Sequence, residues 1–187
     1  DLAEPEAHKC KRDRLNETVK EDTEVCLVHN AAAMVVDNAR EAKPDVLSKV
    51  LRINVIAPVI FNQHLIMKMK PGSSIIYIGS TLSEKGVPNS FSYVTSKHAV
   101  LGLMRSTCQD LVGMEIHTCC VCPGFSVREM LRAHVSNVEE ILSSLSSLST
   151  FGRLIDPKEI AGTVLFAAKN PVLNGAIMHA NLGQIEA

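Results

Sequence analysis

A tyrosine and a lysine stand four residues apart in the segment Ser92–Lys97, as Tyr93 and Lys97. In a helix, residues at this spacing share one face, so the phenol and the ammonium would be neighbours. An unperturbed tyrosine has a pKa of about 10 and is a poor proton shuttle near neutral pH, but a nearby positive charge stabilises its phenolate. The pair is therefore a candidate proton donor and acceptor, although the same spacing also marks ordinary exposed pairs.

A hydroxyl group precedes this pair at the end of an apolar run. Residues 74–78 are typical of a buried parallel strand, which leads through Gly79 to Ser80. In open α/β sheets, ligands bind at the carboxyl ends of the strands. Ser80 is thus a candidate site residue, and the competing interpretation is a serine that simply ends a strand.

The order of these residues resembles the short-chain dehydrogenase/reductase family, whose reaction centre combines a strand-end Ser, a helical Tyr-x-x-x-Lys and an upstream Asn. Three further landmarks match in order: Asn54 for that Asn, Asn30 in segment 29–32 for the family's Asn-Asn-Ala-Gly motif, and Pro123–Gly124 for its Pro-Gly turn. Segments 151–154, 156–161 and 174–176 also have counterparts in the family. The resemblance therefore covers nearly the whole chain.

The resemblance implies hydride transfer between a nicotinamide cofactor, NAD or NADP, and a carbonyl or secondary alcohol. Tyr93 would exchange the hydroxyl proton, and Ser80 would hydrogen-bond the substrate oxygen. Lys97 would lower the Tyr93 pKa and hold the nicotinamide ribose, while Asn54 would hold a water in the proton relay. The competing role of Asn54 is to cap or satisfy buried backbone, and that of Lys97 is a solvated helix residue.

The same resemblance assigns residues to the cofactor. The expected set is Asp1, Leu2, Asn30, Ala31, Ala32, Tyr93, Lys97, Pro123, Gly124 and Ser126. Ala32 replaces the family's final glycine and His29 its first Asn, which we expect to alter backbone approach to the adenine ribose. Arg128 stands where the family commonly has a Thr that contacts the carboxamide, and Ser126 is the nearest hydroxyl.

The family's glycine-rich turn, Thr-Gly-x-x-x-Gly-x-Gly, does not occur in these 187 residues. Its glycines let the backbone approach the cofactor pyrophosphate at a helix N-terminus. We therefore expect the first two and a half βα units to be absent. Two alternatives to an active oxidoreductase are a non-catalytic remnant or binding protein and an isomerase or epimerase that uses the same tyrosine pair.

The elements that must position these residues alternate between strand and helix. Strands are expected near 24–29, 74–79, 115–122 and 176–181, and helices near 4–20, 46–69, 90–112, 128–149 and 157–168. Pro58 should kink the second helix and cost it a backbone hydrogen bond near Asn54. The alternation indicates an α/β protein: a single Rossmann-like domain over 1–187, with a doubly wound parallel sheet and, by resemblance, a substrate lid around 126–152.

Composition limits the function classes. The 46% hydrophobic content suits a substantial core, and the net charge of −1 offers no basis for nucleic-acid binding. Apolar stretches stop well short of the ~20 residues of a membrane span, and the polar N-terminal residues are unlike a secretory signal. We expect a cytoplasmic protein with a small-molecule substrate and, by resemblance, a homodimer or homotetramer.

Six cysteines raise the question of a metal or of disulfides. In the segment Cys119–Cys122, neighbouring strand residues point to opposite faces, so its three sulfurs do not easily converge on one ion. Cys10, Cys26 and Cys108 are too scattered to complete a ligand set. We expect buried reduced thiols and no metal.

Overall fold

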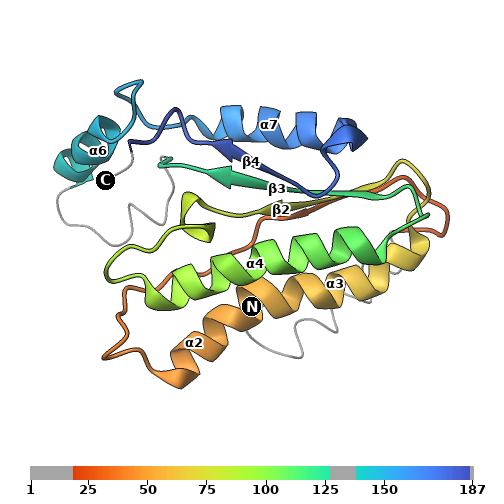
Figure 1. Cartoon of the computed structure of the whole chain (residues 1–187), viewed down its shortest axis with the longest axis horizontal. Helices are drawn as coiled ribbons and strands as arrows, with labels where there is room; N and C mark the ends of the chain where they lie inside the picture. Colours follow the sequence, from red (N-terminus) through yellow and green to blue (C-terminus); the bar gives the residue numbers. More distant parts are fainter. Residues whose placement is uncertain (1–18, 127–137, 186–187) are drawn as a thin grey trace.

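The computed structural model describes residues 19–126 and 138–185. Within these ranges, four parallel strands form one sheet in the order β1-β2-β3-β4: Cys26–His29, Ser74–Ile78, His117–Pro123 and Ala176–Ala180. Figure 1 shows helices α2 (Pro44–Leu51), α3 (Ala57–Leu65) and α4 (Phe91–Asp110) on one face, and α7 (Pro157–Lys169) on the other. The predicted α/β arrangement, with a parallel sheet covered by helices on both faces, is confirmed.

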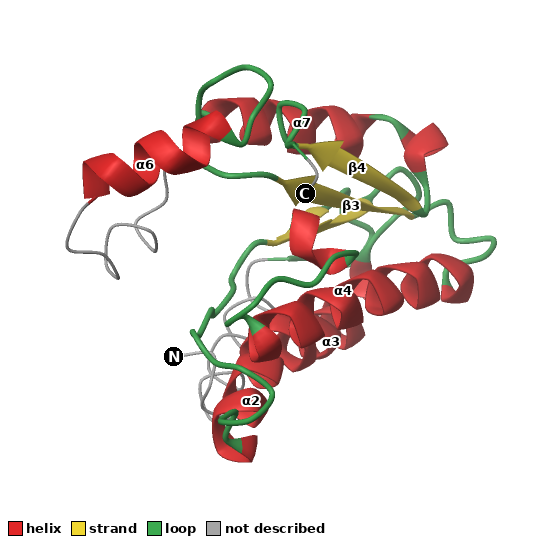
Figure 2. Cartoon of the chain, turned by 60° about the vertical axis from the view of Figure 1, so that its left-hand side comes forward, coloured by secondary structure: helices red, strands yellow, loops and turns green. Residues whose placement is uncertain are grey.

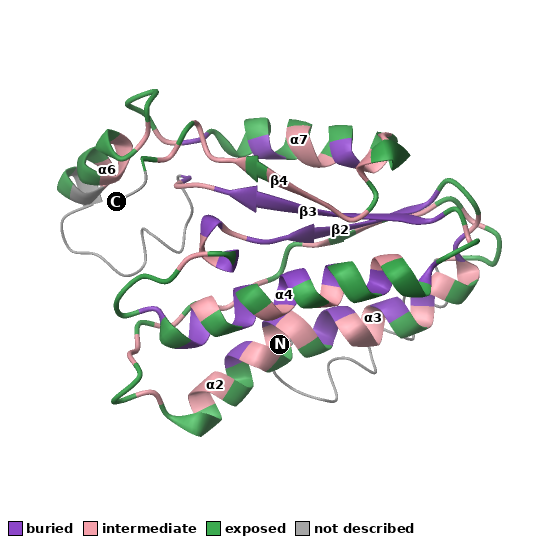
Figure 3. Cartoon of the chain, viewed as in Figure 1, coloured by how far each residue is buried: buried purple, intermediate pink, exposed green. Residues whose placement is uncertain are grey.

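The two central strands are buried along their whole length, because helices cover both of their faces (Figure 3). On the α4 face, Tyr77 packs with Val100, Leu101 and Met104. On the α7 face, Ile76 packs with a second cluster that includes Ala167. The outer strand β1 instead alternates exposed and half-buried residues.

The helix that carries Asn54 is interrupted, as Pro58 predicts. Between α2 and α3 the chain forms one π-helical stretch, Arg52–Ile56, where the Ala57 N–H donates to the carbonyl of Arg52. Pro58 has no N–H to donate to the Asn54 carbonyl, so the regular α-helical bond is impossible there. A wider turn at this point is the usual way to absorb such a break, and π turns often mark functional sites.

The same helix qualifies the expectation about membrane spans. Over Pro44–Lys68 it is long and apolar enough to cross a membrane by length and composition alone. Here Val50, Ala57 and Leu65 along it are buried, and Leu65 belongs to the cluster on the α4 face. A core helix of this kind passes the same length and composition test.

The predicted strands and helices within the described residues are confirmed to within a few residues at their ends. Residues 4–18 of the first predicted helix and residues 127–137 of the predicted lid lie outside the described residues. Helix α6 (Val138–Ser147) lies beside the carboxyl ends of the strands (Figure 2). Its C-terminal side is tied to the end of the chain, since Thr150 N–H donates to Gly183 (3.1 Å) and Ile185 N–H to Leu148 (2.7 Å).

Candidate active site

Ser80 lies directly after β2, at the carboxyl edge of the sheet, and begins the 3-10 turn Thr81–Ser83. Its Oγ accepts a hydrogen bond from Leu82 N–H at 3.1 Å, and its own N–H donates to Ser83 Oγ at 3.0 Å. These bonds hold the Ser80 backbone in place and occupy one lone pair of its hydroxyl. A serine hydroxyl also carries a donor, so Ser80 can both end the strand and donate to an oxygen beside the sheet edge.

Helix α4 holds the tyrosine and the lysine side by side. Lys97 Nζ lies 5.6 Å from the centre of the Tyr93 ring and donates to the Ile78 carbonyl at 2.8 Å. Tyr93 is 7% exposed and Lys97 only 3%, so the ammonium is desolvated and needs such partners. Because Ile78 is the last residue of β2, this bond joins the pair to the strand that leads to Ser80.

Asn54 connects the loop after β1 to the tyrosine helix. Its Oδ1 accepts from Ala33 N–H (2.7 Å), and its Nδ2 donates to the Ala33 carbonyl (2.9 Å) and to Ser96 Oγ (2.8 Å). Ser96 in turn donates to the Tyr93 carbonyl at 2.7 Å. The Asn54 amide group is thus already hydrogen-bonded within the protein. A water bound here would therefore hydrogen-bond to the backbone of the π-helical stretch rather than to this side chain.

Tyr77, the other tyrosine of the chain, is fully buried, and its hydroxyl is hydrogen-bonded within the core. Asn62 Nδ2 donates to Tyr77 OH at 2.6 Å, and Tyr77 OH lies 3.1 Å from Thr107 Oγ1, which itself donates to Leu103. His29 Nε2 extends this chain through a 2.8 Å contact with Asn62 Oδ1. Burial raises the pKa of Tyr77, against the smaller effects of these hydrogen bonds. Tyr77 therefore stays protonated, which leaves Tyr93 as the candidate acid.

Among the described residues, the expected cofactor residues outside α4 lie at or after the ends of β1 and β3, and β2 lies between these two strands. Asn30 and Ala31 are exposed and Ala32 is half-buried in the loop after β1. Asn30 and Ala31 also border a hollow of about 220 Å³ between β1 and α3, where Pro58 and Phe61 form part of the wall. Asp1 and Leu2 lie outside the described residues, as does Arg128.

The Pro123–Gly124 turn follows β3 at the same edge. A Cβ at Gly124 would come within 2.9 Å of Asn181, so only glycine lets the two backbones approach this closely. Ser126, the first residue of the predicted lid, is 4% exposed and forms a β-bridge with Ile155.

Sequence reasoning missed Asp37. Its two carboxylate oxygens accept from Ser92, Oδ1 from the N–H at 2.9 Å and Oδ2 from the hydroxyl. Phe91 N–H also donates to the Asp37 carbonyl at 3.1 Å. Ser90, at the start of α4, makes no side-chain cap, so Asp37 supplies the anionic acceptor that this N-terminus favours. No sequence signal points to this contact, because Ser90 is itself a common N-cap residue and Asp37 lies far from it in the chain.

Comparisons with known proteins extend over most of the chain. The family profile described as enoyl-(acyl carrier protein) reductase matches residues 11–184. An uncharacterized oxidoreductase of Thermotoga maritima is 33% identical over 164 residues, which is 84% of this chain and 65% of the relative. An NADPH-dependent aldehyde reductase 2, chloroplastic, of Arabidopsis thaliana is 29% identical over 98% of this chain and 68% of its own.

Among solved structures, the angucycline C-6 ketoreductase LanV with bound NADP has a TM-score of 0.86 and 28% identity. That match covers 98% of this chain and 72% of LanV. A short-chain dehydrogenase family protein of Francisella tularensis has a TM-score of 0.88 and 25% identity, over 98% of this chain and 78% of that protein. The chain spans about two thirds of the length of the two curated relatives named above.

Proposed function

We propose that this chain, which belongs to the short-chain dehydrogenase/reductase family, carries the reaction centre of an NAD- or NADP-dependent oxidoreductase. The reaction is hydride transfer between the nicotinamide and a carbonyl or secondary alcohol of a small molecule. The observation that carries the proposal is the buried Tyr93–Lys97 pair, whose ammonium is held by Ile78 next to the strand end that bears Ser80.

The strand-end residues fit a dinucleotide. Asn30 and Ala31 are exposed after β1, and the Pro123–Gly124 turn lies close to Asn181 because its glycine has no side chain. NADP is bound in the LanV structure, and the Arabidopsis reductase is NADPH-dependent by name, which supports the same class of cofactor here. When bound, the nicotinamide supplies or accepts the hydride.

The protein groups then have separate tasks. In the direction of reduction, the Tyr93 phenol gives its proton to the substrate oxygen, and the Lys97 ammonium stabilises the phenolate that remains. The Ser80 hydroxyl donates to the same oxygen and stabilises the charge that develops on it. Asn54 holds the loop after β1 against α4, and the backbone beside it is the place for a relay water.

The absent glycine-rich turn favours a second candidate for the 187 residues taken alone. Without that turn, the pyrophosphate loses the backbone N–H groups that contribute much of dinucleotide affinity. A non-catalytic binding role for this chain alone follows from that feature. An epimerase with the same tyrosine pair would differ by retaining its cofactor without net oxidation or reduction.

Assembly and location are further proposals. Exposed apolar side chains at Ile56, Met67 and Val112 lie on or directly beside the helices of the α4 face, which supports a homodimer or homotetramer built on that face. Light scattering of the purified chain tests it, and a monodisperse monomer would count against it. A cytoplasmic location stays a prediction, to be checked by fractionation.

The test of the proposed function is oxidation of NADPH and NADH by an extended chain that includes the upstream coding sequence, with a panel of aldehydes and ketones. We expect turnover that falls by about 10²–10⁴-fold in Tyr93→Phe while cofactor binding persists. Cofactor binding without turnover on any carbonyl, or turnover that Tyr93→Phe leaves unchanged, would overturn the assignment.

A further inference from the structure

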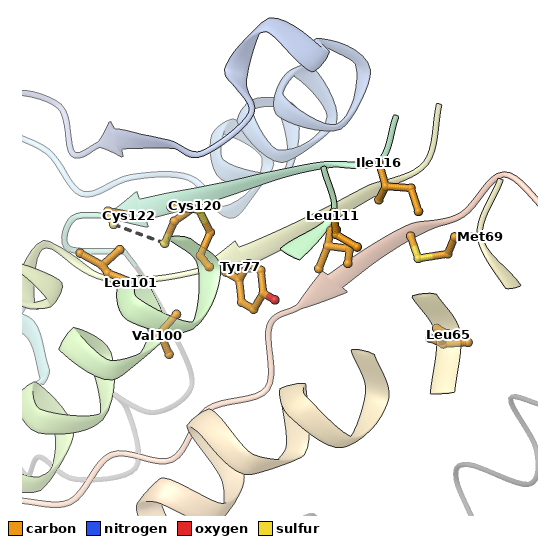
Figure 4. Close-up of a cluster of buried hydrophobic side chains, with 11 residues drawn as sticks. Leu65, Met69, Tyr77, Val100, Leu101, Leu111, Ile116, Cys120 and Cys122 are labelled. Carbon is orange, nitrogen blue, oxygen red and sulfur yellow. Dashed lines mark hydrogen bonds between the residues drawn. The ribbon is translucent and has the colours of Figure 1, made fainter. Parts of the chain in front are cut away.

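Two cysteines of β3 face each other in the core below the reaction centre. Cys120 and Cys122 are two residues apart on one strand, so their side chains share the α4 face of the sheet. Their Sγ atoms are 3.8 Å apart, and both residues are fully buried among apolar side chains that include Leu101 (Figure 4). Cys119 points to the other face and belongs to the other cluster.

The pair lies directly against the backbone that leads to Ser80. A Cβ at Gly79 would be 2.7 Å from the Cys122 sulfur, 2.8 Å from the Cys120 sulfur and 3.0 Å from Ser83 Oγ. Glycine at this position therefore makes room for both sulfurs. On the other side, Cys122 is followed by the Pro123–Gly124 turn. A movement of either sulfur would thus reach the strand ends that carry the proposed reaction.

The two thiols are chemically unequal. Hydrogen bonding to Cys120 lowers the pKa of Cys122, burial opposes this, and the Ser80 backbone and the Ser83 side chain lower it further. Hydrogen bonding to Cys122 and burial raise the pKa of Cys120. We favour Cys122 as the thiol that loses its proton more readily, because it receives these extra hydrogen bonds. A thiolate is the form that attacks an oxidant.

We propose that Cys120 and Cys122 form an oxidative modification site, at which a hydroperoxide converts the two thiols into an intrastrand disulfide. The Cys122 sulfur attacks one oxygen of hydrogen peroxide, the O–O bond breaks, and a sulfenic acid and one water result. The Cys120 sulfur then attacks that sulfenic sulfur and displaces a second water as the S–S bond forms. In sum, two thiols are oxidised and one peroxide is reduced to two waters.

Strand geometry makes this bond labile. Residues two apart on a strand have Cα atoms about 6.6–6.8 Å apart, at the upper end of the range of about 4.4–6.8 Å that disulfides accept. Closure therefore strains the end of β3, and strained disulfides are readily reduced again. The expected consequence, which rests on the proposed function, is reversible loss of turnover through displacement of Ser80 and the Pro123–Gly124 turn.

The test treats the 187-residue chain with hydrogen peroxide and maps each cysteine by peptide mass spectrometry. We expect a Cys120–Cys122 disulfide, seen as the loss of two hydrogen atoms and reversed by dithiothreitol. Cys26 is exposed and serves as an internal measure of oxidant exposure. Cys119→Ala is the matched control, because it removes a buried neighbour but keeps the pair. Cys120→Ala should leave Cys122 as a sulfenic acid that dimedone traps.

Intact thiols at Cys120 and Cys122 after Cys26 is fully oxidised would overturn the modification site, whatever the enzyme activity. In the extended chain, oxidation should lower turnover by at least about tenfold, since misplacement by about 1 Å can cost about 10²-fold. Cys120→Ala should resist that loss. A disulfide that leaves turnover unchanged would overturn the link to catalysis, and a chain without turnover would refute the proposed function but not the modification.

Discussion

The carboxyl ends of β2 and β3 and the outer edge of β1 are built differently, although they belong to one sheet. Ile76 and Tyr77 in β2 are fully buried, whereas Val28 in β1 is 38% exposed. β2 has a strand on each side, and β1 pairs only with β2 in the described part of the chain. The proposed proton-transfer residues therefore lie beside strands that are paired on both sides, while the loop proposed to hold the cofactor follows β1, an edge strand of the described sheet. Catalytic geometry and cofactor affinity should respond to different changes.

The largest expected effect is that of replacing Tyr93, which lies beside the buried strands. Tyr93→Phe keeps the ring but removes the acid, so turnover in the extended chain should fall by about 10²–10⁴-fold with little change in cofactor affinity. The matched control is Tyr77→Phe, which removes the hydroxyl of the other tyrosine and should cost stability rather than catalysis. Equal turnover in wild type and Tyr93→Phe, measured in steady state, would remove Tyr93 from the mechanism.

The free energy of unfolding should also distinguish the buried strand β2 from the outer strand β1. Ile76→Ala creates a cavity in the buried sheet and should lower the free energy of unfolding by about 2–5 kcal/mol. Val28→Ala, in the partly exposed strand β1, should lower the free energy of unfolding by about 0.5 kcal/mol. Urea unfolding followed by circular dichroism measures both values. Similar losses for the two variants would mean that the edge of β1 is covered in solution, for instance by a second copy of the chain.

A smaller effect is expected where the loop after β1 meets the start of α4. Asp37→Ala removes the acceptor for both Ser92 donors and should lower the free energy of unfolding by about 0.5–2 kcal/mol, as for a lost helix cap. Because Ser92 precedes Tyr93, kcat should fall more than KM rises. Asp37→Asn keeps one acceptor oxygen and should recover part of both losses. Loss of stability without any change in kcat would limit Asp37 to a structural role.

The smallest effect concerns the exposed contact between Arg153 and Glu159. Arg153 forms two hydrogen bonds with Glu159, at 2.7 and 2.8 Å. Hydrogen bonding to Arg153 first, and then to the Asp156 backbone, lowers the pKa of Glu159 from 4.5 to about 2. The lowered pKa means that the carboxylate stabilises the fold above pH 4.5 and that this contribution disappears as the pH falls towards 2.

Glu159→Gln should therefore lower Tm slightly above pH 4.5, and the difference from wild type should shrink below it. Solvent screening keeps the effect small. Thermal unfolding at several pH values checks it, and a Tm difference that grows as the pH falls would contradict the sign.

Periodicity and strand-end chemistry predicted the framework because both are local. The alternation of buried runs and helical patterns located β2, β3 and α4, and the spacing of Tyr93 and Lys97 predicted their adjacency. Pro58 predicted a break in its helix, but the π-helical form of that break depends on packing. The Asp37–Ser92 contact joins residues far apart in sequence, so no local sequence pattern indicates it. The roles of Ser80 and Asn54 in catalysis stay predictions.

The central claim is that the reaction centre proposed for Tyr93 and Lys97 needs the family's glycine-rich turn for cofactor affinity, and its most direct test is a titration of NADPH and NADH into two proteins. One is the 187-residue chain, and the other is the extended chain with its upstream coding sequence. Fluorescence and calorimetry follow binding. We predict saturable binding by the extended chain and none by the 187-residue chain. Saturable binding of equal affinity to both would contradict the account, because cofactor affinity would then reside entirely in the strand ends described above.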